Sequence, residues 1–295
     1  MSLISKLKKH GILGSLKIGE VKVSTKINHI LFNLCKIHPV DEKLIVMESE
    51  GDLSDNAFAL FDYMLKNGYL EKYRVIWLVD DVNKALKKNY PNTSFVIKQP
   101  IHIDYKRAKS LATCKWYIYD HCNLMSLYKK RKEQKIIYLS HGAGFKASKG
   151  RQAKIVSDYD IMTATGPLAA ESLSKFWNRD KSNCIITGYP RIDYFFNKDN
   201  TILKEIERKW QFDKYDKKIF WMPTFRQSIN ASLSEDYIQN STGLPIFAAL
   251  NDLKIFDEFL YKNNLLVIFK LHHLQANLEI FKYKFRNIRI VRDED

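Results

Sequence analysis

Short, uninterrupted apolar runs recur along the chain and are separated by polar segments. In the first two thirds they lie at 44–47, 75–79, 95–97, 116–119, 136–139, 161–162 and 184–186. Their residues are mostly β-branched or aromatic and do not alternate with polar ones, which is typical of strands buried on both faces of a parallel sheet. Segments with helical spacing lie between them, for example at 56–66 and 104–113. This alternation predicts right-handed βαβ units in a doubly wound α/β domain.

The pattern changes after Asn197. A charged segment, 198–218, is predicted to hold one helix and the crossover to a second domain. Further strands are predicted at 219–222, 265–269 and 288–291, with a helix at 245–262. Because a doubly wound domain normally has about five or six strands, the second domain is predicted to be incomplete. The predicted division is a basic segment at 1–40, a first domain at 41–197 and a second, partial domain at 198–295.

Charge narrows the choice of partner. The 295 residues include 48 Lys and Arg against 33 Asp and Glu, a net charge of +15. Such an excess calls for a polyanionic partner, which is a nucleic acid, an anionic lipid or a phosphate-bearing substrate. The basic residues are spread along the chain instead of forming one stripe interleaved with aromatics, so no nucleic-acid partner is predicted. The four cysteines have no metal-like spacing, and neither a metal nor a cofactor is predicted.

Residues 1–40 stand apart because they carry seven lysines against one acid, Glu20. Apolar Leu3, Leu7 and Leu13 interleave with the first lysines, a pattern that suits contact with an anionic membrane surface. The alternative is a solvated basic tail, and Gly11, Gly14 and Gly19 are expected to weaken any continuous helix there. With no apolar run of membrane-spanning length and no signal-peptide pattern, the predicted location is cytoplasmic.

Four predicted strands end in Gly, Pro, His, Lys or Arg, in the segments 139–142, 187–191, 221–226 and 269–273. Because carboxyl ends of parallel strands converge on one crevice, these side chains are expected to surround one ligand. His141 offers a titratable imidazole, and Lys146 follows it closely. The cationic residues at the other strand ends suit a diphosphate, and they are Arg191, Arg226, Lys270 and His272. The alternative for each is structural, such as a strand cap for His141 or an Arg191–Asp193 pair.

One of these segments carries a family resemblance. Gly188-Tyr189-Pro190-Arg191-Ile192-Asp193 resembles the G-x-P-R-x-D motif of the CDP-glycerol glycerophosphotransferase family, whose members prime or polymerise teichoic acids and related capsular polymers. Further segments resemble that family in the same order: Asp55-Asn56 its D-N-x-x-x-L helix, 140–146 its H-G-x-x-x-K loop, 223–226 its P-T-[WF]-R segment and 270–272 its K-x-H-P segment. This chain has His273 where the family has Pro, and it ends before the family's T-D-Y-S-S segment, so we expect a C-terminally truncated member.

The resemblance implies a GT-B-like fold, in which two Rossmann-like domains face a cleft. It implies transfer of glycerol phosphate, or another polyol phosphate, from its CDP-activated form to a hydroxyl of a lipid-linked acceptor, with release of CMP. His141 would be the general base. Residues implied for donor binding are Gly188, Arg191, Pro223, Thr224, Arg226, Lys270 and His272, and those implied for the acceptor side are Asp55, Asn56, Gly142 and Lys146. The enzyme would use no metal and would lie on the inner face of the cell membrane.

Two alternatives of other kinds remain open. One is a GT-B glycosyltransferase that uses a nucleotide sugar to build a cell-surface polysaccharide, because it would share the fold and the cationic diphosphate site. The other is an inactive truncated remnant or a membrane-bound accessory protein. The identity of the polyol, and the choice between a primase and a polymerase, also stay open.

Overall fold

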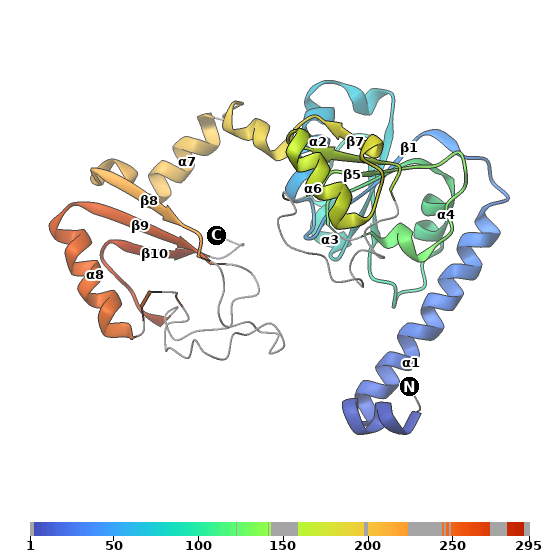
Figure 1. The fold of residues 1–295 in the computed structure, drawn as a ribbon, viewed down its shortest axis with the longest axis horizontal. Helices are drawn as coiled ribbons and strands as arrows, with labels where there is room; N and C mark the ends of the chain where they lie inside the picture. Colours follow the sequence, from blue (N-terminus) through green and yellow to red (C-terminus); the bar gives the residue numbers. More distant parts are fainter. Residues whose placement is uncertain are drawn as a thin grey trace. The chain divides into compact units, whose positions relative to one another are not determined.

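The computed structural model describes residues 3–121, 123–140, 142, 159–197, 200–223, 244, 246–247, 249–271 and 282–291. In the first helix, side chains are described from Gly19 onward. The chain forms two compact units, Met1–Asn197 and Lys198–Asp295. Each unit is a parallel sheet covered by helices, so the predicted α/β class is confirmed (Figure 1).

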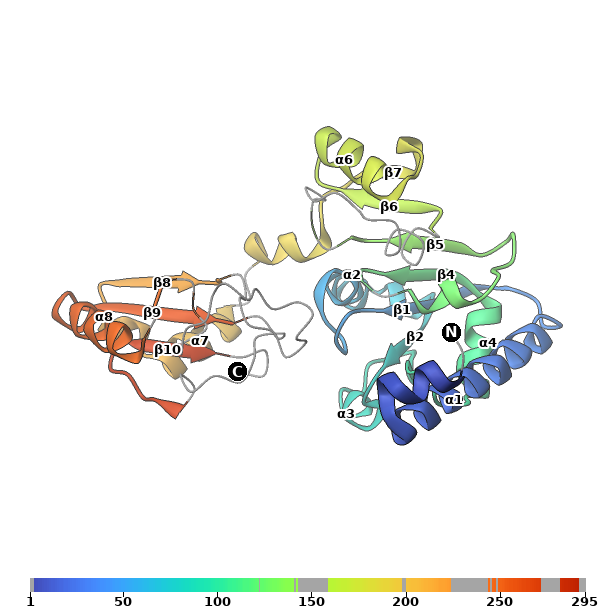
Figure 2. The same cartoon turned by 60° about the horizontal axis from the view of Figure 1, so that its bottom comes forward.

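The first unit contains a seven-stranded parallel sheet with the order β3-β2-β1-β4-β5-β6-β7 (Figure 2). Its strands are β1 (Asp41–Glu48), β2 (Arg74–Val79), β3 (Thr93–Ile97), β4 (Cys114–Tyr119), β5 (Lys135–Tyr138), β6 (Ile161–Ala164) and β7 (Cys184–Ile186). Its α-helices are α1 (Leu3–Cys35), α2 (Asp55–Lys66), α3 (Val82–Leu86), α4 (Tyr105–Thr113) and α6 (Pro167–Trp177). Its short 3-10 helices are η1 (Tyr69–Glu71), η2 (Leu124–Leu127), η3 (Lys181–Asn183) and η4 (Pro190–Phe195).

Both faces of this sheet are packed, which is why its strands read as continuous apolar runs. On one face, Phe61 of α2 and Ala85 of α3 pack with Trp77 of β2. On the other, Leu111 of α4 and Leu173 of α6 belong to a second core. Of these helices, α3 and α6 were not named in the sequence analysis.

The order of the strands determines where a ligand crevice forms. From β1 the chain builds outward to β2 and β3, then returns to place β4 on the other side of β1. The connections after β1 and β4 therefore diverge to opposite sides, and this topological switch point is where open α/β sheets bind ligands, at the carboxyl ends of the strands. The segments that follow β1, β4 and β5 consequently form the place to look for a site.

Helix α1 is continuous from Leu3 to Cys35, although Gly11, Gly14 and Gly19 were expected to weaken a continuous helix there. Each glycine costs about 1 kcal/mol of helix propensity, which a 33-residue helix with tertiary support can offset. That support comes from its second half, where Phe32 and Cys35 join the core beside α4. The buried Asn28 amide donates to the carbonyls of Pro100 (2.9 Å) and His102 (3.0 Å). No described helix is long and apolar enough to cross a membrane.

The second unit is smaller in its described part. Its parallel strands lie in the order β10-β9-β8. The elements are α7 (Asn200–Trp210), η5 (Phe212–Lys214), β8 (Lys217–Trp221), α8 (Leu250–Lys262), β9 (Leu265–Lys270) and β10 (Ile288–Val291). Leu253 and Leu260 of α8 pack on one face of the sheet, and Trp210 and Phe212 pack on the other. The predicted helix at 198–218 and all three predicted strands are present.

Candidate active site

The segment that precedes His141 leaves the sheet in an unusual conformation. Strand β5 ends at Tyr138, and the next residues, Leu139 and Ser140, are buried. The Thr163 hydroxyl donates to the Leu139 carbonyl (2.6 Å) and ties this exit to β6. Ser140 has a φ of 58°, in the left-handed region that residues other than glycine rarely adopt. Such a conformation costs about 1–3 kcal/mol and persists only where the surroundings hold it. His141 itself, with Lys146, lies outside the described residues.

The side chain of Asn56 holds the segment that leaves β5 in place. Its side chain is fully buried, and its amide nitrogen donates to the Ser140 carbonyl at 2.7 Å. Its amide oxygen accepts from the backbone N–H of Arg191 at 3.1 Å. One amide group therefore joins the first turn of α2, the end of β5 and the 3-10 helix η4. Three segments that the sequence singled out separately meet at this side chain.

Asp55 makes a second link between the same segments. Its carboxylate accepts from the Arg191 guanidinium, with 2.5 Å between nitrogen and oxygen. The Arg191 guanidinium also lies over the Tyr189 ring, 5.9 Å from its centroid. The alternative pairing of Arg191 with Asp193 is thus replaced by a pairing with Asp55. Arg191, predicted on the donor side, lies against the two residues predicted on the acceptor side.

A buried acidic side chain, that of Asp120, binds the first turn of α2. Asp120 directly follows β4 and accepts from the Ala57 backbone N–H at 2.8 Å. Burial raises the pKa of Asp120 to about 8, partly offset by backbone hydrogen bonds to its carboxylate. Asp120 therefore helps to position Asn56, because it binds the backbone N–H of the next residue in the chain, Ala57.

Glu48 is a second buried acidic residue of the first unit. It ends β1, is buried, and accepts from the Tyr117 hydroxyl and from the Leu124 backbone N–H (2.9 Å). Burial raises the pKa of Glu48 to about 7, against the opposing effect of these hydrogen bonds. The sequence analysis missed both acids. Asp120 could have been found, because it follows a predicted strand in the same way as His141 does.

The two glycines of the site differ in their backbone requirement. Gly188 has a φ of 77°, so a residue with a side chain would be strained there, although a Cβ would meet open space. Its N–H donates to the Ala164 carbonyl (3.0 Å), which anchors the start of the motif to β6. At Gly142 a Cβ would also meet nothing within 4 Å. Gly188 is thus needed for a turn, and neither glycine is required by crowding within the described residues.

In the second unit, two of the predicted donor residues, Pro223 and Lys270, lie at one edge of the sheet. Trp221 of β8 pairs in register with Phe269 of β9. Pro223 follows the end of β8 and Lys270 ends β9, so both lie at the carboxyl edge of the same parallel pair. Thr224, Arg226 and His272 lie outside the described residues. In the ranges that the structure describes, no group of three or more His, Cys, Asp or Glu side chains is placed to hold a metal.

Known proteins with a similar sequence or structure agree with this architecture. The chain is 26% identical over 215 residues to the teichoic acid ribitol-phosphate primase of Bacillus spizizenii, covering 66% of this chain and 52% of the primase. It is 24% identical over 286 residues to the teichoic acid poly(glycerol phosphate) polymerase of the same organism, covering 88% of this chain and 67% of the polymerase. The chain thus spans about half the length of the primase.

Structures of the wall teichoic acid polymerase TagF share the fold. One of them, soaked with CDPG, superposes with a TM-score of 0.67 at 19% identity, covering 98% of this chain and 69% of the polymerase. The model of the family described as CDP-glycerol:poly(glycerophosphate) glycerophosphotransferase matches residues 30–295, which is most of the chain. The resemblance found in the sequence motifs is therefore confirmed, and the chain belongs to the CDP-glycerol:poly(glycerophosphate) glycerophosphotransferase family.

Proposed function

We propose that this protein transfers a polyol phosphate from a CDP-activated donor to a hydroxyl group of a growing teichoic acid or capsular polymer that is linked to a lipid. The acceptor oxygen attacks the phosphorus that bears the polyol. A new phosphate ester bond forms, the bond to the bridging oxygen of the diphosphate breaks, and CMP leaves with that oxygen. The acceptor proton passes to His141, which acts as general base.

The observation that carries this proposal is the double hydrogen bond of Asn56. It fixes the backbone immediately before His141 against the segment that bears the family motif at Arg191. A general base must lie within hydrogen-bond reach of the proton that it removes, so its supporting backbone has to be held within a fraction of an ångström. A buried amide with both ends bonded supplies such a support.

Charge neutralisation is assigned to the second unit. Phosphoryl transfer depends mainly on positioning and on stabilisation of charge at the phosphoryl oxygens. Lys270 and Pro223 lie at one sheet edge, and Arg226 and His272 follow the same two strands in the sequence. In the proposal, Arg226, Lys270 and His272 hold the diphosphate of the CDP-activated substrate, and the Thr224 hydroxyl adds an uncharged hydrogen-bond donor.

The proposed position on the inner face of the cell membrane rests on α1. Val23, Ile30 and Leu34 are exposed and share one face of α1, opposite to the face that packs on α4, and Ile37 is exposed just beyond the end of the helix. Leu34 is 60% exposed and Ile37 83%. Lys22 and Lys26 flank this face, which suits apolar insertion with ammonium groups at lipid phosphates.

The proposal is tested by nucleotide release. Protein is incubated with a lipid-linked acceptor analogue and, in separate reactions, with CDP-glycerol, CDP-ribitol and UDP-sugars. Acceptor-dependent release of CMP from a CDP-polyol supports it. Release of UDP from a sugar donor, with no CMP, would indicate the glycosyltransferase alternative, and no release from any donor would indicate an accessory protein.

A further inference from the structure

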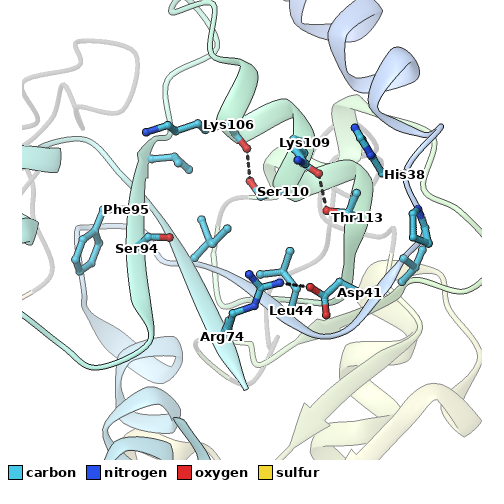
Figure 3. Close-up of a pocket in the computed structure, with 14 residues that line it drawn as sticks. His38, Asp41, Leu44, Arg74, Ser94, Phe95, Lys106, Lys109, Ser110 and Thr113 are labelled. Atoms are coloured by element: carbon cyan, nitrogen blue, oxygen red, sulfur yellow. Dashed lines mark hydrogen bonds and ion pairs between the residues drawn. The ribbon is translucent and has the colours of Figure 1, made fainter. Parts of the chain in front are cut away.

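A cavity of about 590 Å³ lies at the amino-terminal edge of the seven-stranded sheet, at the opposite end of the strands from the candidate active site (Figure 3). It lies between the starts of β1 and β2, the middle of β3 and one side of α4. Cavities that bind small molecules typically measure about 300–1,000 Å³. None of the residues predicted for the active site lines it.

The cavity lies on the sheet face that α4 covers. The helix between β2 and β3, α3, adds no cover there, because its buried residue, Ala85, belongs to the core on the other face. The floor is therefore formed by side chains of the sheet itself, from Leu44, Ile76 and Val96. Figure 3 shows Ser94 pointing into the space and its neighbour Phe95 pointing away, as expected for successive strand residues.

Three hydroxyl groups line the wall above this apolar floor, from Ser94, Ser110 and Thr113. Ser110 donates to the Lys106 carbonyl and Thr113 to the Lys109 carbonyl, each at 2.8 Å. Because their protons are used within α4, these two groups offer a ligand only oxygen lone pairs, so they do not bind an anionic group. The Ser94 hydroxyl adds a group that can donate or accept.

The rim is cationic. Lys106 and Lys109 lie one turn apart on α4, and Arg74 at the start of β2 makes an ion pair with Asp41. Within the described part of the chain, no hydrogen bond or ion pair engages the ammonium group of Lys106 or Lys109. The three cations less the one carboxylate leave two positive charges. A phosphate monoester carries about −1.5 to −2 at pH 7, which matches that excess.

We propose that this cavity binds a phosphate monoester with an apolar body, the phosphate at Lys106 and Lys109 and the body on the floor of Leu44, Ile76 and Val96. The combination decides the class of ligand. An apolar molecule would leave two cations uncompensated, and inorganic phosphate would fill only a small part of the cavity of about 590 Å³. The ligand is either a soluble phosphate ester or the headgroup region of an anionic lipid, and both have this chemistry.

The test uses the whole chain and measures binding by calorimetry. The probes are hexyl phosphate, hexanol and inorganic phosphate, of which hexyl phosphate is expected to bind most tightly. The variant Lys106→Gln/Lys109→Gln is expected to weaken hexyl phosphate binding by about tenfold, the loss of roughly two partly screened charge contacts. The matched control, Lys87→Gln/Lys88→Gln, removes the same charge from exposed positions after α3 and should leave binding unchanged.

A second variant tests the role of the cavity's volume independently of its charge. Ser94→Leu fills the space without changing the net charge, and it should block hexyl phosphate while the far-ultraviolet circular dichroism stays unchanged. Flotation with phosphatidylcholine vesicles, with and without phosphatidic acid, distinguishes the two sources of the ligand. If Lys106→Gln/Lys109→Gln weakens only the binding to vesicles, the ligand is a lipid. If it weakens only the binding of hexyl phosphate, the ligand is a free ester.

Equal weakening by both lysine double variants would overturn the proposal, since it would show a general charge effect. Hexyl phosphate binding no tighter than inorganic phosphate would also overturn it. Nucleotide release is not a readout of this test, so its outcome is independent of the proposed transferase activity.

Discussion

Replacing Asn56 by Ala tests whether one buried amide holds the site together. The change removes a donor to the Ser140 carbonyl and an acceptor for the Arg191 N–H, and it leaves both backbone groups without that partner. Each unsatisfied buried polar group costs about 1–3 kcal/mol, so for the two groups we expect a loss of about 2–6 kcal/mol in the free energy of unfolding of the first unit. Urea denaturation followed by tryptophan fluorescence measures this loss.

Hydrogen exchange locates the effect. In Asn56→Ala, exchange should accelerate at the amides around 138–142 and 189–192 and stay unchanged in β2 and β3. Asn56→Asp refines the test, because it keeps an oxygen for the Arg191 N–H but places a carboxylate beside the Ser140 carbonyl. It should therefore accelerate exchange mainly around Ser140. The matched control is Asn67→Ala, whose side chain donates to the Tyr63 carbonyl (2.8 Å) at the exposed end of the same helix, and which should cost no more than about 0.5 kcal/mol.

The reasoning is refuted if Asn56→Ala costs no more than Asn67→Ala, or if both variants leave the exchange around Ser140 unchanged. Either result would mean that the exit of β5 is held by other contacts. The hydrogen bond from Thr163 to the Leu139 carbonyl would then be the first to examine.

Three further predictions follow from the same structure. Glu48 has a folded-state pKa of about 7 against an ordinary value of 4.5, so its contribution to stability is complete below about pH 4.5 and is lost as the pH rises through 7. In Glu48→Gln, the fall in the free energy of unfolding between these pH values should be smaller by about 3 kcal/mol. An unchanged pH dependence in urea titrations would contradict this prediction. Leu34→Glu should abolish flotation with anionic vesicles, whereas Asn33→Glu, an exposed neighbour with the same charge change, should reduce it less; equal losses would contradict insertion of the apolar face. Lys270→Ala should raise KM for the CDP-polyol by about tenfold, and an unchanged KM would remove Lys270 from the donor site.

The sheet and most helices could be predicted from the sequence because burial on both faces imposes a simple pattern. A strand between two helical layers has no polar positions along most of its length, and the predicted runs at 75–79 and 265–269 match β2 and β9 to within one residue at each end. Helix α6 was missed, although Pro167 at its start and the spacing of Ala170, Leu173 and Trp177 are signals of a helix. The glycines of α1 were expected to weaken a continuous helix, but propensity is a weak guide where tertiary packing supports one half of a helix.

The site could be predicted only in part. The strand-end rule and the family motifs pointed to Asn56, Ser140 and Arg191, but their mutual contacts are set by the three-dimensional fold. Asn56 lies 84 positions from Ser140 and 135 from Arg191. Pairing of Arg191 with nearby Asp193 was the simplest local reading, and the fold instead brings Asp55 to it. Glu48 was overlooked because a buried carboxylate within a strand has no local sequence pattern, whereas the position of Asp120 directly after a predicted strand was a signal that could have been used.

The central claim is that a polyol phosphate moves from its CDP donor to an acceptor hydroxyl with His141 as the base. Mass spectrometry of a synthetic lipid-linked acceptor after incubation with CDP-glycerol or CDP-ribitol tests it most directly. We predict that the acceptor gains whole polyol phosphate units with the native protein, and none with His141→Ala, whose circular dichroism and urea midpoint should be unchanged. An acceptor that gains no polyol phosphate from any CDP donor, or one that gains it equally with His141→Ala, would contradict the account.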